Sequence, residues 1–319
     1  MNLTTSTGIR LIYSLPEKFG QVHSCPVLAR IGNDMRKSVL LGRLSCVFLI
    51  LIGSPLLAWD YNSICAYIEE RFEHAEISAD PFPHIVIKDI LPEDYYQELC
   101  NSWPSESFDK QSPTWRKLIE VGNTQKWGGE PQDKWIEFAS LVDNIIKRKL
   151  AEVFYPLTPH RFGYPLPSGS LCNAASQFEH RLFQDYHHGV GIHIDKAYKL
   201  AAVMIYFPID YQEEHNILGT VLYRHKNHKE SIDYANANNN DCVAVKQLTY
   251  APNTLCAFFQ APHGWHSAPM EASYQKIRSS LSSRRSYFTN IYLTPTFMQA
   301  TYGTMFGFKE DFFDEMASY

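Results

Sequence analysis

The stretch GVGIHIDKAYKLAAVMIYFPID, residues 189–210, decides the fold of this chain and the place of its chemistry. His193 and Asp195 stand two positions apart, directly before an apolar run that is typical of a buried strand. In an extended segment residues i and i+2 project to the same side, so the imidazole and the carboxylate share one face. The triplet alone does not distinguish metal ligands from a turn pair, because His-x-Glu triplets also occur at 74–76 and 228–230.

The residue pattern of the second half of the chain predicts a β-rich core around this stretch. Between residues 170 and 293, short β-branched or aromatic segments alternate with Gly, Pro, Asn and Asp, as in strands joined by turns. The polar, Asn-rich segment 224–241 is expected to be a mobile surface loop. The predicted strands are 177–186, 199–208, 218–223, 242–248, 254–259 and 284–293.

In the first half of the chain, the apolar residues recur with a helical period instead. A helix is predicted after Trp59, and a second begins at Pro92, whose acidic neighbours suit a first helical turn. A long amphipathic helix follows from Asp133, with one apolar stripe ending near Val153. A strand is expected at 84–90 and a loop at 104–131. An α-rich first half attached to a β-barrel or double-sheet second half predicts one α+β domain.

Composition and charge narrow the class of protein. The chain has 319 residues, of which 45% are hydrophobic, and its net charge is -5. No Lys/Arg cluster reverses this negative balance locally, so we expect no nucleic-acid partner. The seven cysteines form no C-x-x-C pair and are odd in number, which fits a reducing compartment better than a disulfide scaffold or a zinc ribbon.

The first 58 residues are treated as a lead that precedes a catalytic domain at 59–319. Residues 44–58 are apolar and follow a basic stretch, which resembles a signal peptide starting at Met35. The run is short for a membrane span and has a poor cleavage site, so a packed segment or a mis-assigned start is the alternative. We expect a cytoplasmic protein; export or a membrane anchor through residues 35–58 is the other possibility.

Two further histidines lie on a turn after the predicted strand 254–259. The segment NTLCAFFQAPHGWHSAP, residues 253–269, presents His263 and His266. Two imidazoles and one carboxylate make the facial triad of non-haem Fe(II) oxygenases, which leaves adjacent metal positions open for a cosubstrate and dioxygen. Either histidine completes the set, and the residues alone leave the choice between His263 and His266 open.

An arginine pair opens the last predicted strand, SRRSYFTNIYL. Arg284 and Ser286 stand at i and i+2, and a guanidinium with a hydroxyl suits a buried dicarboxylate. Neighbouring strand residues face opposite sides, so only one of Arg284 and Arg285 reaches a pocket. The Arg-x-Ser spacing favours Arg284, and the choice between the two stays open.

Taken in order, these motifs resemble the Fe(II)/2-oxoglutarate-dependent dioxygenase superfamily, in particular its prolyl-hydroxylase-like members. The motifs are His193-x-Asp195, LGTVLY at 218–223, NTLCAFFQAPHGWH, and RRSYFTNIYL; the leader DPFPHIVIKDILPEDYYQELCNSWP also looks like one branch of the family. The resemblance implies a double-stranded β-helix (jelly-roll, cupin-like) core with flanking N-terminal helices.

The resemblance also implies a site and an activity. Fe(II) would be held by His193, Asp195 and His266, and the cosubstrate 2-oxoglutarate by Arg284 with help from Ser286; Tyr186 is a further candidate donor. The implied reaction is hydroxylation of a substrate C–H with release of succinate and CO2, on a small-molecule or peptide substrate whose identity the sequence leaves open. The alternative is a non-catalytic or sugar-processing cupin-like binding protein.

Overall fold

The computed structural model describes residues 60–111, 116–123, 125, 127, 132–167, 180–185, 190–268, 275–276 and 283–302. The expected lead, 1–58, and the candidate donor Tyr186 lie outside these residues. So do His187 and His188, which the sequence places close to the candidate site.

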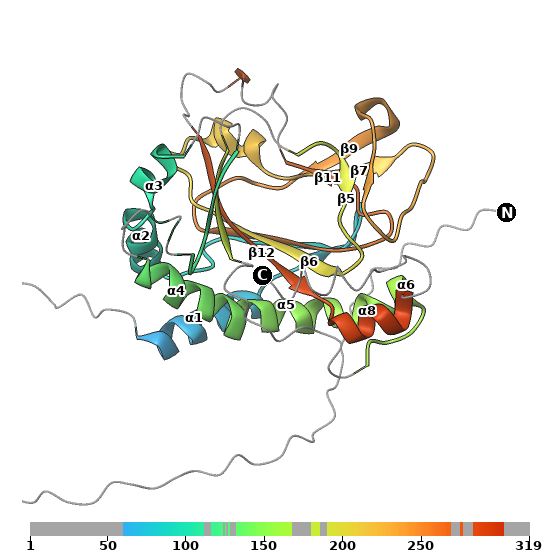
Figure 1. Cartoon of the computed structure of the whole chain (residues 1–319), viewed down its shortest axis with the longest axis horizontal. Coiled ribbons are helices and arrows are strands. Elements are labelled where there is room, and N and C mark those ends of the chain that lie inside the picture. Colours follow the sequence, from blue (N-terminus) through green and yellow to red (C-terminus); the bar gives the residue numbers. More distant parts are fainter. Residues whose placement is uncertain are drawn as a thin grey trace, which may run out of the picture. The chain divides into compact units, whose positions relative to one another are not determined.

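A seven-stranded antiparallel sheet forms the larger of two β layers (Figure 1). Its central strands are covered on both faces; β10, for example, is buried at every position. In spatial order its strands are β1 (Ile77–Ser78), β2 (His84–Ile87), β10 (Thr254–Phe259), β6 (Lys199–Tyr206), β12 (Arg284–Tyr292), β4 (Arg181–Asp185) and β3 (Arg116–Glu120).

A five-stranded sheet forms the second layer and carries the strands that flank the His-x-Asp motif. The two candidate histidines are direct register partners in it, His266 opposite His193. In spatial order its strands are β8 (Ala235–Asn236), β5 (His193–Ile194), β11 (His266–Ser267), β7 (Val221–His225) and β9 (Cys242–Gln247).

The path of the chain between the two sheets is that of a jelly roll. From β4 onward the chain passes from the large sheet to β5 in the small sheet and back to β6. It then forms the hairpin β7–β9 in the small sheet and alternates again through β10, β11 and β12. Alternation of consecutive strands between two facing antiparallel sheets defines the double-stranded β-helix. The expected α+β class with a jelly-roll core is confirmed.

Helices cover the outer face of the large sheet (Figure 1). Strand alternation turns Tyr287 of β12 toward them, and its ring lies 4.8 Å from that of Phe138. Phe154 meets Phe259 of β10 at 5.9 Å in the same layer. The helices are α1 (Tyr61–Glu73), α2 (Glu93–Asn101), α3 (Ser105–Asp109), α4 (Asp133–Leu141), the π-helix η1 (Val142–Ile146), α5 (Lys147–Phe154), α6 (Thr158–Phe162) and α8 (Pro295–Tyr302); the short 3₁₀ turns are η2 (Tyr155–Leu157), η4 (Glu213–Leu218) and η5 (Asn239–Asp241).

The structure departs from the sequence-based expectations at three places. The helix expected from Asp133 onward is interrupted by the π turn η1, which the apolar stripe does not reveal. The expected loop 104–131 contains α3 and the edge strand β3, which pairs with β4. The segment 224–241, expected to be a mobile loop, contains β8, which pairs with β5 so that Asn236 lies opposite His193.

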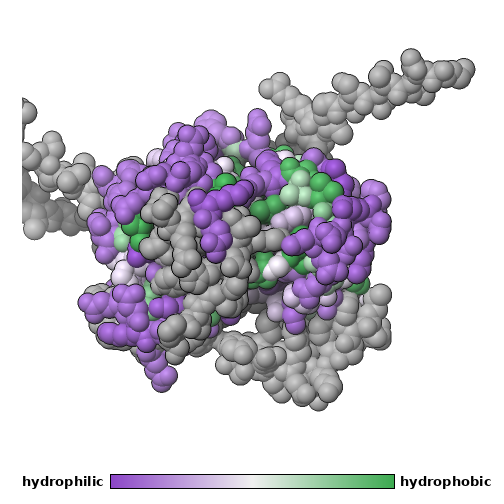
Figure 2. Space-filling view, turned by 90° about the horizontal axis from the view of Figure 1, so that it is seen from above, coloured by the Kyte–Doolittle hydropathy of each residue, from purple (hydrophilic) through white to green (hydrophobic). Residues whose placement is uncertain are grey.

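The surface and the cysteines of the described residues have properties that are ordinary for a globular protein. Figure 2 shows a face that is mainly hydrophilic, with hydrophobic side chains in patches between the polar ones. The four cysteines that the structure describes, Cys65, Cys100, Cys242 and Cys256, are free thiols. None of the helices in the described ranges combines the length and the apolar composition needed to cross a bilayer.

Candidate functional site

Three potential metal ligands meet where the small sheet faces the large one. His193 lies on β5, His266 begins β11 on the neighbouring strand, and Asp195 directly follows β5. The ligand atoms of these three side chains all lie within 4.8 Å of one another. The two imidazole rings are 4.3 Å apart between centroids, because strand pairing places the two residues side by side.

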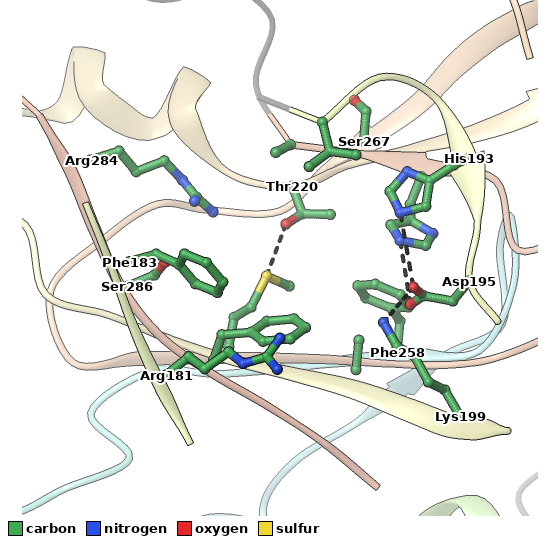
Figure 3. A pocket seen from close by; sticks show the side chains of 16 residues that line it. Arg181, Phe183, His193, Asp195, Lys199, Thr220, Phe258, Ser267, Arg284 and Ser286 are labelled. Atoms are coloured by element: carbon green, nitrogen blue, oxygen red, sulfur yellow. Dashed lines mark hydrogen bonds and ion pairs between the residues drawn. The ribbon is translucent and has the colours of Figure 1, made fainter. Parts of the chain in front are cut away.

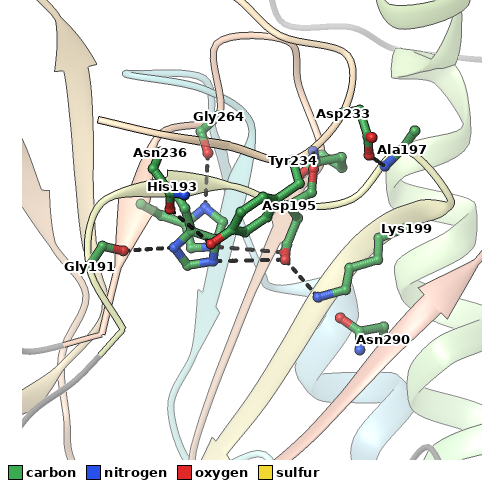
Figure 4. Close-up of polar contacts among 12 residues, drawn as sticks. Gly191, His193, Asp195, Ala197, Lys199, Asp233, Tyr234, Asn236, Gly264 and Asn290 are labelled. Atoms are coloured by element: carbon green, nitrogen blue, oxygen red, sulfur yellow. Dashed lines mark hydrogen bonds and ion pairs between the residues drawn. The ribbon is translucent and has the colours of Figure 1, made fainter. Parts of the chain in front are cut away.

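Both imidazoles are held in the same orientation by backbone carbonyl groups (Figure 4). Nδ1 of His193 lies 2.8 Å from the carbonyl oxygen of Gly191, and Nδ1 of His266 lies 2.9 Å from that of Gly264. A carbonyl oxygen only accepts, so each Nδ1 carries the proton and each Nε2 keeps its lone pair. Those Nε2 atoms face Asp195, at 3.9 Å from Oδ1 for His193 and 3.6 Å from Oδ2 for His266.

The rival ligand His263 lies elsewhere. Its side chain is exposed, and it is not part of the cluster that His266 forms with His193 and Asp195. The backbone N–H of Gly264 donates to the carbonyl of Ala261 at 2.9 Å and closes a turn that contains His263. His266 follows this turn. His266 therefore has the position that the motif requires of the third ligand.

The charges of the three groups suit a divalent cation. Burial, together with the neighbouring imidazole of His193, lowers the pKa of His266 to about 3, so this ring is neutral at physiological pH. Burial would raise the pKa of Asp195, but the ammonium of Lys199 and the two imidazoles outweigh it and hold the pKa at about 2. Two imidazoles and one carboxylate are the donors that first-row transition metals such as iron bind.

A cavity of about 240 Å³ extends from these ligands between the two sheets. Asp195 and His193 lie at one end of it, and Arg284 lies at the opposite end (Figure 3). Ser286, Thr220 and Ser267 add hydroxyl groups to its lining. The cavity thus joins a potential metal centre to a guanidinium across one enclosed space.

The two adjacent arginines occupy different surroundings. Arg284 is 2% exposed and lines the cavity, with its guanidinium over the rings of Tyr206 and Tyr250. Arg285 points to the other face of β12, where it lies 5.1 Å from the ring centroid of Trp103 and donates to Ser105. Strand alternation separates them, and of the two only Arg284 lines the cavity.

Arg284 also has a buried carboxylate partner that the sequence did not reveal. Its Nη1 donates to Oδ2 of Asp185 at 2.9 Å, and its Nε donates to the carbonyl oxygen of Leu218 at 2.8 Å. Asp185 is fully buried and stands opposite Arg284 in the β4–β12 register. The guanidinium is therefore fixed in place by the protein before any ligand arrives.

Ser286 and Thr220 line the cavity together with Arg284, and Gly219 directly precedes Thr220. The Thr220 hydroxyl lies 3.2 Å from that of Tyr206, and burial raises the pKa of Tyr206 to about 12, so the phenol stays protonated. A Cβ added to Gly219 would lie 1.4 Å from the carbonyl oxygen of Leu248. Only glycine allows this close backbone approach at the wall of the cavity.

Lys199 and Arg161 are further residues that sequence reasoning missed. Lys199 forms a 2.6 Å ion pair with Oδ1 of Asp195 (Figure 4), and its i+4 spacing from the aspartate was the available signal. Arg161 of α6 donates to the backbone carbonyl oxygens of Lys199 at 2.6 Å and Ala197 at 2.5 Å. No local sequence pattern connects α6 to that segment, because the contact spans more than thirty residues.

Trp127 belongs to the segment 104–131, which the sequence predicted to be a loop. Trp127 is 1% exposed, donates from its indole nitrogen to the carbonyl oxygen of Glu120 and does not line the cavity. Its role in the structure is packing. Trp115 lies outside the described residues.

Comparison with known proteins gives matches among solved structures. A prolyl hydroxylase from Trichoplax adhaerens, in complex with a hypoxia inducible factor oxygen degradation domain peptide fragment, has a TM-score of 0.39 and 12% identity over 73% of this chain and 88% of that chain. Prolyl 4-hydroxylase from Phytophthora capsici has a TM-score of 0.42 and 12% identity over 78% of this chain and 74% of that chain. The Fe(II)/α-ketoglutarate-dependent dioxygenase TqaL has a TM-score of 0.36 and 11% identity over 73% and 88%.

No protein-family model matches the sequence, and no curated protein matches it.

Proposed function

We propose that this chain is an Fe(II)- and 2-oxoglutarate-dependent oxygenase that hydroxylates a C–H bond of its substrate. The balanced reaction takes up dioxygen and 2-oxoglutarate, places one oxygen atom on the substrate and the other in succinate, and releases CO2. One observation carries the proposal: both His193 and His266 donate Nδ1–H to a carbonyl group, so that both Nε2 atoms converge with Asp195 on one point. Second-shell bonds of this kind are what orient histidines that bind metals.

The residues present fit a three-ligand iron site. His193, Asp195 and His266 would hold the ion, and bound iron supplies the redox chemistry that activates dioxygen. Lys199 keeps Oδ1 of Asp195 occupied at 2.6 Å, which leaves Oδ2, the oxygen nearer His266, as the ligand atom. A set of three protein ligands leaves positions for a bidentate cosubstrate, as this reaction requires.

Arg284 would bind the distal carboxylate of 2-oxoglutarate. A guanidinium has five N–H groups, of which Leu218 and Asp185 each take one in the contacts described above. The Ser286 hydroxyl also lines the cavity and can donate to the same carboxylate, whereas the Thr220 hydroxyl donates to Sδ of Met204 at 3.3 Å. Tyr186 stays a proposed donor on sequence grounds alone.

A cupin-like binding protein without catalysis is the second candidate, and the Asp185–Arg284 pair is the observation that favours it. Because Asp185 compensates the charge of Arg284, burial of this arginine has a structural reason even without a dicarboxylate ligand. The ligand set at the other end of the cavity therefore carries the distinction between the two functions. In a non-catalytic protein 2-oxoglutarate would not bind next to the metal.

An anaerobic titration of the full chain tests the proposal. Fe(II) is added first and 2-oxoglutarate second, while the visible absorption band of the metal chelate is followed. We expect a band in the wild-type protein that is lost in His266→Ala, because Nε2 of this residue is one of the three ligands. His263→Ala is the matched control, since it removes an exposed imidazole three residues away.

Two outcomes would contradict the proposal. Iron binding with no band upon addition of 2-oxoglutarate would support the non-catalytic jelly roll. An equal band in wild-type protein and His266→Ala would mean that the metal binds elsewhere. If the band forms, succinate release upon admission of oxygen is the readout with which substrates are then sought.

A further inference from the structure

A second arginine lines the cavity and is not used by the proposed reaction. Arg181 of β4 is half-buried, and its guanidinium is directed into the cavity between the Arg284 end and the Asp195 end (Figure 3). Its Nε is buried without a hydrogen-bond partner. Within the part of the chain that the structure describes, no side chain forms an ion pair or hydrogen bond with this guanidinium. A buried, unsatisfied N–H group is costly unless a ligand or water completes it.

The other charges of the cavity are already compensated. Lys199 pairs with Asp195, and Arg284 pairs with Asp185. When both are bound, the two positive charges of Fe(II) balance the two negative charges of 2-oxoglutarate. Among the charged side chains that line the cavity in the described residues, Arg181 alone keeps an unbalanced charge.

The position of Arg181 separates it from the proposed cosubstrate subsite. In the strand register Arg181 lies opposite Phe288, whereas Asp185 lies opposite Arg284. Four residues of strand correspond to about 13 Å at the usual rise per residue. One dicarboxylate bound at Arg284 and reaching toward the metal would leave the Arg181 end for another molecule.

Apolar rings surround this charge. Phe183 stands two residues along β4 on the same face, and its ring lies 5.6 Å from that of Phe288. Both line the cavity, as does Met204 on the neighbouring strand β6. A guanidinium beside two phenyl rings is suited to a ligand that has an oxyanion attached to an apolar body.

We propose that Arg181, with Phe183 and Phe288, forms the substrate subsite, and that the substrate carries an oxyanion, a carboxylate or a phosphate, on an apolar group. That the bound molecule is a substrate rests on the proposed oxygenase function. The anion site itself does not depend on iron. The volume also limits the substrate: about 240 Å³ corresponds to roughly eight water molecules, so 2-oxoglutarate leaves room for only a small part of a second molecule.

Binding of matched charged and uncharged probes tests the subsite. Benzoate and benzamide form one pair, and phenyl phosphate and phenol form the other; each is titrated calorimetrically into the full chain, first metal-free and then saturated anaerobically with Fe(II) and 2-oxoglutarate. Wild-type protein is compared with Arg181→Gln, Arg181→Lys and Arg284→Gln. The two pairs distinguish a carboxylate from a phosphate ester as the recognised group.

We expect at least one charged probe to bind the saturated wild-type protein about ten- to hundredfold more tightly than its uncharged partner, as charge-assisted hydrogen bonds imply. Arg181→Gln loses that advantage, while its affinity for 2-oxoglutarate stays within about twofold of wild type. Arg181→Lys keeps part of the advantage, because the charge remains and the planar fork is lost.

Several results would overturn the subsite. Equal binding of charged and uncharged probes by the wild-type protein would do so whether or not any variant folds. So would an unchanged preference in Arg181→Gln, or a loss of 2-oxoglutarate affinity in Arg181→Gln that matches the loss in Arg284→Gln. If no metal chelate band forms, the oxygenase function fails, and the metal-free titration still decides whether Arg181 binds an anion.

Discussion

At the scale of single residues, the cavity depends on which of two nearby residues of the same type faces it. Arg284 and Arg285 are sequence neighbours, yet one lines the cavity and the other lies over Trp103 on the opposite face of β12. His266 and His263 differ in the same way, one buried in the ligand cluster and one exposed. Each pair supplies its own control for a substitution experiment.

Arg284→Gln is expected to raise the Kd for 2-oxoglutarate about ten- to hundredfold, because hydrogen bonds to a charged carboxylate are lost. The substitution also leaves Asp185 buried without its cation, which lowers stability. The double variant Arg284→Gln/Asp185→Asn removes that unpaired charge and should regain stability but not affinity. Arg285→Gln should bind 2-oxoglutarate like wild type, measured by titration of the absorption band; a similar loss in both single variants would contradict the assignment.

Gly219→Ala is expected to lower the free energy of unfolding by about 3 kcal/mol, the upper part of the range for overpacked sites. The added methyl group would collide with the Leu248 carbonyl, which belongs to the backbone and moves only with its strand. Gly191→Ala is the control, since nothing lies within 4 Å of its added Cβ and the carbonyl that accepts from His193 is retained. Urea unfolding measures both; equal midpoints would refute the close approach.

At the scale of elements, the site is held by helices that never line it. Helix α6 contributes Arg161, whose two hydrogen bonds fix the segment that runs from Asp195 into β6. The layer of α4, η1 and α5 contributes Asp143, which reaches His180 at 3.0 Å beside β4. His180 in turn is hydrogen-bonded to the Tyr287 hydroxyl on β12. Helix-to-strand polar contacts thus hold the start of β6 and the neighbouring strands β4 and β12.

Arg161→Met should weaken Fe(II) binding at least threefold and lower the melting temperature, because the Ala197 and Lys199 carbonyls lose their donors. Residues that orient the surroundings of a metal ligand commonly change its affinity by more than this. His160→Met, on the exposed side of the same helix, should leave both quantities unchanged. Isothermal titration with Fe(II) under nitrogen gives the affinities, and an unaltered affinity in Arg161→Met would show that α6 does not position the ligand.

Acidification is expected to destabilise the protein through His180. Burial lowers the pKa of this imidazole below 6.5; Asp143 opposes the shift and Lys147 adds to it. The unfolded chain therefore takes up a proton at a higher pH than the folded chain. The contribution to stability is complete above pH 6.5 and is lost as the pH falls toward the folded-state pKa, by up to about 1.4 kcal/mol per pH unit.

Urea midpoints between pH 5 and pH 7.5 measure this dependence. His180→Gln should flatten the curve relative to wild type, whereas His160→Gln, which alters an exposed imidazole, should leave its slope unchanged. Asp143, whose pKa is lowered mainly by His180 and Lys147 against the effect of burial, extends the loss of stability below pH 3.8. A wild-type curve that is flat through pH 6.5 would contradict a neutral, buried His180.

At the scale of the whole molecule, the candidate site connects the two sheets. The proposed metal ligands belong to the small sheet and its edge, while Arg284 and Ser286 belong to the large sheet. Fe(II) and 2-oxoglutarate together should therefore stabilise the fold, by about 2.7 kcal/mol at a hundredfold excess over Kd. For a domain of this size the melting temperature should rise by roughly 5–10 °C.

Asp195→Asn should abolish this rise, and a chelator should reverse it in the wild-type protein. Differential scanning calorimetry with metal alone, cosubstrate alone and both together makes the measurement. A rise with 2-oxoglutarate alone that equals the rise with both would mean that the two ligands do not meet in one cavity.

Local signals in the sequence predicted much of this arrangement. Short β-branched and aromatic segments bounded by turn residues predicted most of the longer strands, and the motifs singled out His193, Asp195 and His266, whose potential ligand atoms the fold brings within 4.8 Å of one another. The partners of these residues were not predictable, because Asp185 meets Arg284 across 99 positions and Arg161 reaches Ala197 across 36. Strand β8 was not predicted, because a strand of two residues is too short to show a pattern of apolar side chains.

The position of β12 has a consequence for how the chain reaches its folded state. This strand comes last in sequence among those described, yet it lies between β6 and β4 inside the large sheet. During synthesis β4 and β6 leave the ribosome first. The edges that will receive β12 stay unpaired until residues 284–292 follow. The nascent chain must therefore keep the exposed edges of β4 and β6 apart from other chains until β12 has been translated, and chaperone demand should end only when β12 inserts.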